Sequence, residues 1–424
     1  MMRDSAIRRQ ESRPAGQTNN VAHDATRQSV KAAHLCPTLL KDVAVWPLFT
    51  HDDSQKDLYI VGNREVDRYV SVPAHKLPVV LKILELFDGQ HSMESIEIQL
   101  YAETHKKVDV RTLYKQLHEN GLLLPVSGEI KKGDIERMSV RLVALDVEKI
   151  FMAVNMLCGV LFPRFVMMMF LLSAIGTPLA LARWEVFVHL FRNTIGGSLR
   201  EEAFLYPVLL LLSFLFHEVA HGIVGARYGI FAKRLEAALY LGFIPIVYLR
   251  IPGLYTLRPS ERIKVWSAGI FWNVSFASFS VALSAWLPLP PAWRDMWLLV
   301  ALTNYFIALS NLCPFLPTDG YFILSTLLKR HNVRSNAWKE LATWAVARKH
   351  KFSSIALSYL VGMLSVMGFT LWRNMLWIRQ LFARSPFLGS VGVILFMLLW
   401  LMCLWKWTGA LQTSSREGSQ VDKE

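Results

Sequence analysis

Cysteine and charge are both scarce in this chain. Only 19% of the 424 residues are charged, against roughly 25% in typical soluble domains. The four cysteines are far apart and form no C-x-x-C pair: Cys36, Cys158, Cys313 and Cys403. Neither a disulfide framework nor a cysteine zinc site follows from them. Together these shortages exclude a disulfide-rich secreted scaffold and make an ordinary soluble enzyme a poor description.

Apolar residues are correspondingly abundant. They make up 53% of the chain, which has 14 Trp and a mean hydropathy of +0.30. About 20 apolar residues are needed for one helical crossing of a bilayer. Six runs after residue 150 reach roughly that length: 164–182, 206–224, 266–287, 296–316, 352–372 and 386–405. The sequence therefore predicts an α-helical polytopic membrane protein with about six transmembrane helices in a lipid bilayer.

Basic residues alternate between the segments that connect these runs. Lys and Arg number 3 in 183–205, 7 in 225–265, 1 in 288–295, 7 in 329–351 and 3 in 373–385. Because cytoplasmic loops carry the excess of Lys and Arg, the alternation places both termini in the cytoplasm. The net charge of +13 is then mainly an orientation signal, supported by attraction to anionic headgroups.

The N-terminal third is more polar and divides in two. Residues 1–37 are poor in large apolar side chains, which predicts a disordered tail. Residues 38–125 predict a small α/β winged-helix-like domain. In it "DLYIVGNREVDRYVSV" reads as a hairpin, three helical segments follow, and "LHENGLLLPV" ends the unit. This order resembles the PqqD-like peptide-recognition domains. Residues 126–163 are expected to be a linker and juxtamembrane helix.

Titratable side chains interrupt the second apolar run in "FLFHEVAHG". His217 and His221 are four residues apart, so both imidazoles project from one face of a helix. Glu218 lies beside them, where its carboxylate can act as a base. H-E-x-x-H on a helix is the zinc-metalloprotease arrangement. Ionisable groups at membrane depth need a compensating interaction, and a bound Zn²⁺ supplies one.

A catalytic zinc needs a third protein ligand, and "NLCPFLPTDGY" offers a carboxylate. His221 lies six residues before Arg227, and Asp319 lies ten residues before Lys329. Both runs are expected to cross from outside to inside, so the two groups lie at similar depth on the cytoplasmic side. The alternative for Asp319 is a turn or helix-cap residue. Matching depth favours the ligand.

The paired motifs "HEVAHG" and "NLCPFLPTDGY" resemble those of the site-2 protease family of intramembrane zinc metalloproteases. That resemblance implies that His217, His221 and Asp319 bind the zinc, and that Glu218 is the general base. The family's substrate-proximal G-x-x-x-N element matches "GIFWN", residues 269–273, which implies a substrate-binding role for Asn273. Asn311 opens the second motif, and that position favours a substrate-binding role for it as well. Residues 164–406 then form the metalloprotease domain, followed by a cytoplasmic tail, 407–424. Thr318 departs from the apolar residue that commonly precedes the aspartate.

Two further features have more than one possible role: a pair of asparagines and an interrupted apolar segment. Asn304 and Asn311 share a helix face, where they can bind substrate or an oxyanion, or simply hydrogen-bond between membrane helices. Residues 236–253 are apolar but broken by Gly242 and Pro245, which predicts a re-entrant hairpin or edge strand. In the site-2 protease family such an element pairs with an unwound substrate.

With its N-terminal unit, the chain resembles the peptide zinc metalloproteases found near ribosomal-peptide modification genes. The resemblance implies a zinc metalloendopeptidase in the bacterial inner membrane, and as partners a peptide or membrane-protein substrate with peptide-modification or export proteins. One alternative is a non-catalytic membrane subunit of a peptide export or immunity system, against which Glu218 argues. The other is a membrane-tethered DNA-binding regulator. No nucleic-acid partner is expected, because acidic residues dilute the basic cluster at 106–115.

Overall fold

The computed structural model describes residues 36–51, 54–124, 139–158, 161–189, 205–240, 244–315, 318–330, 332–347, 353–384, 390 and 394. The expected tails 1–37 and 407–424 and the sixth span, 386–405, therefore lie outside the described residues apart from 36, 37, 390 and 394. The chain divides into two compact units, one within Met1–Pro47 and His51–Lys131, the other within Leu48–Thr50 and Lys132–Glu424. Each is described by itself.

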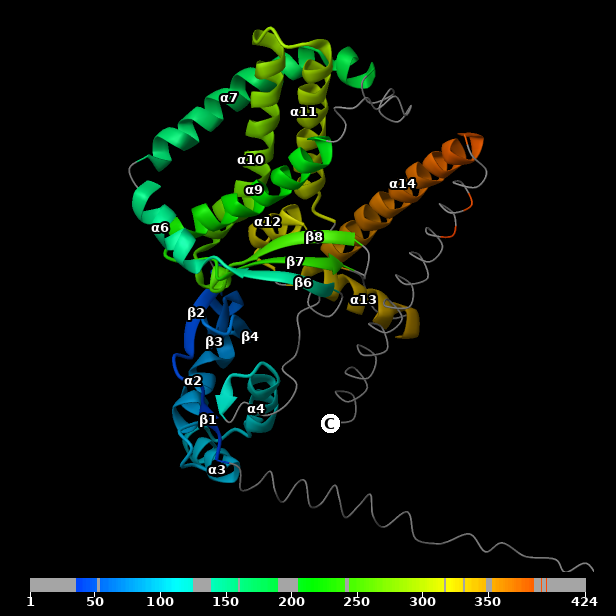
Figure 1. Cartoon of the computed structure of the whole chain (residues 1–424). Helices are drawn as coiled ribbons and strands as arrows, with labels where there is room; N and C mark the ends of the chain where they lie inside the picture. Colours follow the sequence, from blue (N-terminus) through cyan, green and yellow to red (C-terminus); the bar gives the residue numbers. More distant parts are fainter. Residues whose placement is uncertain are drawn as a thin grey trace, which may run out of the picture. The chain divides into compact units, whose positions relative to one another are not determined.

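The first unit combines two small sheets with three helices (Figure 1). Strands β2 (Ala44–Phe49), β3 (Leu58–Asn63) and β4 (Arg68–Pro73) form a sheet in the order β2-β3-β4. The antiparallel pair β3–β4 is the hairpin expected from the alternating pattern. Strand β1 (Thr38–Leu39) pairs antiparallel with β5 (Leu123–Leu124). The sequence did not single out β1 or β2.

Local signals explain the three helices of this unit, α2 (Leu77–Leu86), α3 (Met93–Thr104) and α4 (Val110–Glu119). The Ser92 hydroxyl caps α3 by accepting the Ser95 N–H, and the Asp109 carboxylate caps α4 by accepting the Thr112 N–H at 2.9 Å. Gly121, just beyond α4, has a φ of 66°, which glycine adopts without strain. The apolar faces of the helices meet in one core that includes Val61, Ile83, Ile96 and Leu117.

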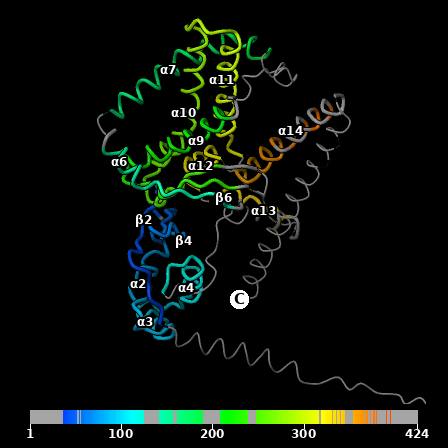
Figure 2. The backbone as a smooth tube through the Cα atoms, in the orientation of Figure 1, coloured from blue at the N-terminus to red at the C-terminus, as the bar shows by residue number. Residues whose placement is uncertain are grey.

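The second unit is mainly helical. Its helices are α6 (Glu148–Cys158), α7 (Phe162–Ala182), α9 (Leu205–Arg227), α10 (Pro259–Trp286), α11 (Pro291–Leu312), α12 (Asp319–Leu327), α13 (Val333–Ala347) and α14 (Ser354–Arg384). A short 3-10 helix lies at Leu254–Thr256; the first unit has two others, at Ser54–Lys56 and Ala74–Lys76. Figure 2 follows the backbone from the strands into α10 and back through α11 to α12.

Four helices among the described residues are long and apolar enough to cross a membrane: α7, the Val208–Arg227 part of α9, α10 and α11. They coincide with the first four of the six expected spans. The fifth expected span lies in α14, whose apolar part, Ser354–Val366, is shorter. A helical membrane protein is therefore supported, while the count of six stays a prediction.

A three-stranded antiparallel sheet lies at one end of the helices of this unit (Figure 1). Its strands β6 (Ser139–Asp146), β7 (Arg234–Tyr240) and β8 (Ile244–Arg250) follow the order β6-β7-β8. The segment expected to be a re-entrant hairpin or edge strand is the β7–β8 hairpin, and β8 lies at the sheet edge among the described strands. The expected linker contains β6, which alternates apolar and polar residues only in part and finds its partner some ninety positions later.

Helix α10 lies at the centre of the unit and packs against α7, α9, α11 and α12. Small residues permit these close approaches. A Cβ atom on Gly176 of α7 would lie 2.4 Å from the Ser278 side chain of α10, and the Ser173 and Ser275 hydroxyls are 2.9 Å apart. Such small-residue contacts and interhelical hydrogen bonds are what holds helices together in lipid. They place the polar faces of α9, α10 and α11 together.

Candidate metal centre

Two histidines project from one face of α9 into the protein interior. His217 and His221 are each 5% exposed, and their ring centroids are 4.9 Å apart. One ligand atom from each of His217, Glu218 and His221 lies within 4.8 Å of the others, so this buried group can hold a metal ion. The spacing of four residues in the sequence produces this arrangement directly.

Asp319, the first residue of α12, approaches the same two rings. Its Oδ2 lies 3.1 Å from Nε2 of His217 and 3.4 Å from Nε2 of His221. The start of α12 lies close against the end of α11, because a Cβ atom on Gly320 would be only 2.3 Å from the Leu312 carbonyl oxygen. The Thr318 hydroxyl donates to the Cys313 carbonyl at 3.0 Å. Thr318 therefore ties the start of α12 to the backbone just after α11.

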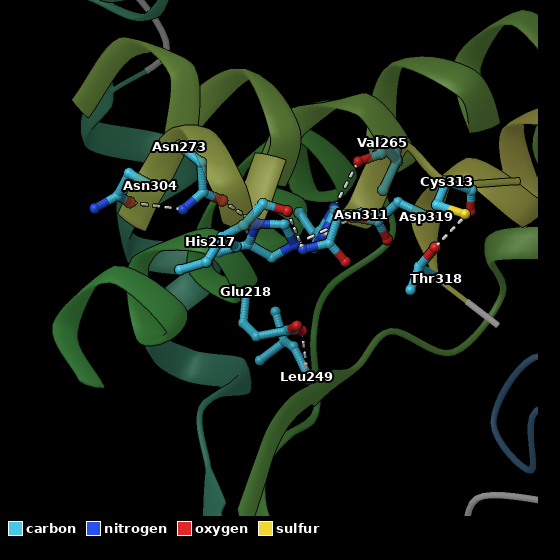
Figure 3. A network of polar contacts seen from close by, with 12 residues as sticks. His217, Glu218, Leu249, Val265, Asn273, Asn304, Asn311, Cys313, Thr318 and Asp319 are labelled. Carbon is cyan, nitrogen blue, oxygen red and sulfur yellow. Dashed lines mark hydrogen bonds and ion pairs between the residues drawn. The ribbon is translucent and has the colours of Figure 1, made fainter. Parts of the chain in front are cut away.

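The Nδ1 atom of each ring has its own acceptor, which is Asn273 for His217 and the Val265 carbonyl for His221. Figure 3 labels both acceptors. Nδ1 of His221 donates to the Val265 carbonyl oxygen at 2.7 Å. Nδ1 of His217 contacts Oδ1 of Asn273, whose amino group donates to Oδ1 of Asn304 at 2.8 Å. With Nδ1 protonated, each Nε2 presents a lone pair towards Asp319.

Three acceptor atoms thus face one another: two imidazole lone pairs and a carboxylate oxygen. Acceptors that converge without a proton repel, and a cation between them removes the repulsion. Tetrahedral ligands at about 2.0–2.1 Å from zinc lie about 3.3 Å from one another. The contacts of 3.1 and 3.4 Å between Asp319 and the two histidines match that spacing. The donor set fits zinc, and Asp319 fits the third position better than Glu218, whose carboxylate has another partner.

Gly269 makes room for the rings. A Cβ atom at this position would lie 2.5 Å from Nε2 of His217 and 2.6 Å from Nε2 of His221. Val265, Gly269 and Asn273 follow one another at intervals of four on α10, so they form one stripe facing the histidine stripe of α9. This complementarity is what the G-x-x-x-N spacing contributes to the site.

The carboxylate of Glu218 points to the sheet, as Figure 3 shows. Its Oε2 accepts the backbone N–H of Leu249 in β8 at 2.9 Å. Helix α9 and β8 approach closely because Gly222 has no side chain: a Cβ atom there would lie 2.6 Å from the Leu249 side chain. Glu218 is therefore oriented by a strand, next to the two histidines and not between them.

Strand β8 is an edge strand of the sheet formed by the described strands, so some of its backbone groups point away from β7. The Leu249 N–H points to Glu218 and away from β7, so Leu249 belongs to a non-hydrogen-bonded pair with Leu235. Because such pairs alternate along antiparallel strands, Val247 and Pro245 also direct their backbone groups away from β7. A proline fits this position, since its missing N–H is not needed by the sheet.

A buried carboxylate braces the same sheet. Glu236 in β7 is 1% exposed, accepts the Tyr248 hydroxyl of β8 at 2.6 Å, and lies 3.0 Å from Nε of Arg141 in β6. One side chain thus joins all three strands. Since Tyr248 precedes Leu249, the brace helps to place the N–H that orients Glu218.

The three asparagines singled out from the sequence make different contacts in the structure. Asn273 is fully buried, and both groups of its amide are used by His217 and Asn304. Asn311 is half-buried and donates to the Ile307 carbonyl oxygen of its own helix at 3.1 Å. Its substrate-binding role stays a prediction. Asn304, which the sequence left open between substrate binding and interhelical contact, makes the interhelical contact.

Three groups at the site were not found from the sequence. Ser213 could have been, because it precedes His217 by one helical turn within an apolar run. The Val265 carbonyl and the Leu249 N–H could not, because every residue but proline carries both groups. Only packing selects which of them meets a side chain.

Comparisons with protein-family models, with curated proteins and with solved structures found no match to this chain. The function is therefore inferred from the residues and their geometry. The relevant facts are the convergence of His217, His221 and Asp319, the adjacent Glu218, and the apolar helix α9 that carries the two histidines and the glutamate.

Proposed function

We propose that this chain is an intramembrane zinc metalloendopeptidase of the site-2 protease type. One observation supports it above all: Nε2 of His217 and Nε2 of His221 both lie within 3.4 Å of Oδ2 of Asp319, with Glu218 alongside. His217, Glu218 and His221 lie on the part of α9 that is long and apolar enough to cross a membrane, and Asp319 begins the shorter helix α12. Three protein ligands and a carboxylate base are the donor set of a hydrolytic zinc site.

When bound by His217, His221 and Asp319, zinc supplies a Lewis acid that polarises a peptide carbonyl and acidifies a water molecule. The chain's own residues do the rest. Glu218 accepts a proton from the attacking water and gives it to the leaving amine. The Leu249 N–H holds the carboxylate on the side of the sheet while it is charged. Val265 and Asn273 keep the two imidazoles in their binding orientation.

The proposed substrate is a peptide or a membrane protein whose scissile segment is extended. A transmembrane helix uses its carbonyls in intrahelical hydrogen bonds, so hydrolysis requires local unwinding. The outward backbone groups of β8 at Val247 and Pro245 can replace part of those lost bonds by strand addition. This is the role that the resembling family gives to its strand-like element.

The alternative of a non-catalytic membrane subunit is disfavoured by the placement of Glu218. A structural metal site has no use for a carboxylate that is held beside the ligands by a separate strand. The alternative of a DNA-binding regulator finds little support in the first unit. There Arg111 lies 3.6 Å from Glu97, which neutralises part of the basic cluster.

Metal content and peptide hydrolysis of the full-length protein in detergent test the proposal together. We expect one zinc per chain, and a loss of zinc in His217→Ala, His221→Ala and Asp319→Ala. Glu218→Gln should keep the zinc and lose about 10²–10⁴-fold in hydrolysis, the range of general-base contributions. Full zinc occupancy in Asp319→Ala would exclude it as a ligand. Undiminished hydrolysis in Glu218→Gln would exclude the protease mechanism.

A further inference from the structure

A row of hydrogen-bonded side chains links three helices and ends on His217. The Ser213 hydroxyl of α9 donates to the Leu209 carbonyl oxygen at 2.8 Å and accepts the Asn304 amide of α11 at 3.0 Å. The Asn304 amide oxygen accepts the Asn273 amide of α10 at 2.8 Å, and Asn273 contacts Nδ1 of His217. Ser213, Asn273 and Asn304 are each no more than 1% exposed.

Two backbone carbonyls fix the direction of every bond in this row. A carbonyl can only accept. The Asn304 amino group also donates to the Val300 carbonyl oxygen at 2.9 Å, and the only proton of Ser213 goes to Leu209. The amino end of Asn304 must therefore face Ser213 and Val300, and its oxygen must face Asn273.

The same reasoning continues to the imidazole. With the Asn304 oxygen facing it, Asn273 must present its own amino group there, and so it presents its oxygen to His217. An amide oxygen accepts, so Nδ1 of His217 carries the proton. Nε2 then keeps its lone pair and faces Asp319. The orientation of both amides and the tautomer of His217 are therefore fixed by these hydrogen bonds.

We propose that Asn304 and Ser213 are positioning residues, which fix the tautomer and ring orientation of His217 through Asn273 so that Nε2 is ready to bind the metal. The inference rests on the proposed function only in taking His217 as a ligand. His221 needs no such row because its Nδ1 meets a backbone carbonyl directly. Both histidines thus carry the proton on Nδ1, but a side-chain amide orients His217 and a backbone carbonyl orients His221.

A purely architectural role for Asn304 makes a different prediction. Interhelical hydrogen bonds in membranes stabilise the bundle modestly. Losing one for purely architectural reasons would lower the stability of the metal-free protein and leave its zinc affinity unchanged. Groups that orient a metal ligand, in contrast, typically change affinity by about 10- to 100-fold. Metal affinity and the stability of the metal-free protein therefore separate the two roles.

The experiment measures the zinc Kd by chelator competition on full-length protein in detergent, together with the unfolding temperature of the metal-free protein. We expect Asn304→Ala to weaken zinc binding about 10- to 100-fold. Ser213→Ala should weaken it less than Asn304→Ala. The matched control is Ser280→Ala, since Ser280 is a fully buried α10 serine whose hydroxyl donates to the Phe276 carbonyl of its own helix and, within the described part of the chain, has no hydrogen bond to another helix. Its zinc Kd should equal that of the wild type.

A double variant tests whether Asn304 acts through Asn273. If it does, Asn273→Ala with Asn304→Ala should bind zinc no more weakly than Asn273→Ala alone, because the route to His217 is already cut. With Co²⁺ in place of zinc, Asn304→Ala should also change the visible absorption that reports ligand geometry.

The inference is overturned if Asn304→Ala binds zinc within about two-fold of the wild type, well under the expected loss, or if the two losses add in the double variant. If Asn304→Ala does not fold, Ser213→Ala decides in its place, and a zinc Kd equal to that of Ser280→Ala overturns the inference. A wild-type protein that binds no zinc refutes the proposed function instead. The two failures are therefore distinguishable.

Discussion

The backbone N–H of Leu249 donates a 2.9 Å hydrogen bond to the carboxylate of Glu218, 31 residues earlier in the chain. This contact joins an edge strand to the helix that carries the two histidines. It holds the proposed base while leaving Nε2 of both rings to the ligand position. The sheet thereby contributes a backbone group to the candidate site.

Removing this N–H should impair catalysis without removing the metal. In Leu249→Pro we expect kcat to fall about 10- to 100-fold, since hydrogen bonds to charged groups contribute about 1.5–3 kcal/mol. Zinc content should be unchanged. Steady-state kinetics and metal analysis check both. A kcat equal to that of the wild type would show that Leu249 does not orient the base.

Val247→Pro is the matched control for that change. Val247 lies two residues before Leu249, so its N–H also faces away from β7, whereas the Glu218 carboxylate accepts the N–H of Leu249. If an extended substrate pairs with β8, Val247→Pro should raise KM more than it lowers kcat. Equal effects of both prolines on kcat would indicate general damage to the strand.

A side chain at Gly269 should exclude the metal. In Gly269→Ala the new Cβ would lie 2.5 Å from Nε2 of His217, inside any normal contact, so the ring must move. We expect zinc affinity to fall at least as far as for a lost orienting group, about 10- to 100-fold. Gly368→Ala is the control, because nothing lies within 4 Å of a Cβ there. Normal zinc binding in Gly269→Ala would contradict the proposed position of the ion.

The cap of α4 should depend on pH. Burial raises the pKa of the Asp109 carboxyl, but hydrogen bonds from the Thr112 hydroxyl and backbone N–H outweigh it and leave the pKa below its ordinary value. The carboxylate therefore stabilises α4 above the unfolded pKa of about 3.9, and the contribution is lost as pH falls through the folded pKa. Asp109→Ala should cost about 1 kcal/mol at pH 7 and less in acid.

Hydrogen exchange of residues 110–119 in the full-length protein measures this effect, after correction for the intrinsic rate at each pH. Asp109→Asn keeps a capping oxygen without the charge, so it should retain most of the protection at pH 7 and lose the dependence on pH. The same pH dependence in Asp109→Asn would assign the effect to another group.

The alternation of basic residues predicts which loops face the cytoplasm. Single cysteines introduced near Lys339 should be shielded from an impermeant thiol reagent in intact cells, and those near Arg294 should react. We expect this labelling because segment 329–351 contains 7 basic residues and segment 288–295 contains 1. The reverse labelling would overturn the proposed orientation and the cytoplasmic-side active site.

The first unit is proposed to recruit the substrate. Strand β4 lies at an edge of the sheet β2-β3-β4, where an extended peptide can add as a further strand. Deleting 38–125 should slow cleavage of the natural substrate at low concentration and leave zinc content unchanged, because tethering raises the effective concentration at the site. Peptide binding by full-length Glu218→Gln should depend only modestly on salt. Specific DNA binding with a steep salt dependence would favour the regulator.

The sequence by itself determined the local features. The spacing of His217 and His221 follows from 3.6 residues per turn, and the apolar runs predicted helices α7, α9, α10 and α11. Ser92 and Asp109 cap α3 and α4 through hydrogen bonds to residues three positions later, within one helical turn. Each of these depends on neighbours in the chain, so no fold is needed to read it.

The tertiary structure decided which distant groups meet. Asp319 reaches His217 from 102 residues away and contacts His221 as well, and β6 joins the sheet although its sequence was assigned to a linker. Val265 and Leu249 contribute backbone groups that their side chains do not reveal. Backbone donors and acceptors are the same at almost every position, so the sequence cannot distinguish them. The packing of α9 against α10 and β8 selects the ones that orient His221 and Glu218.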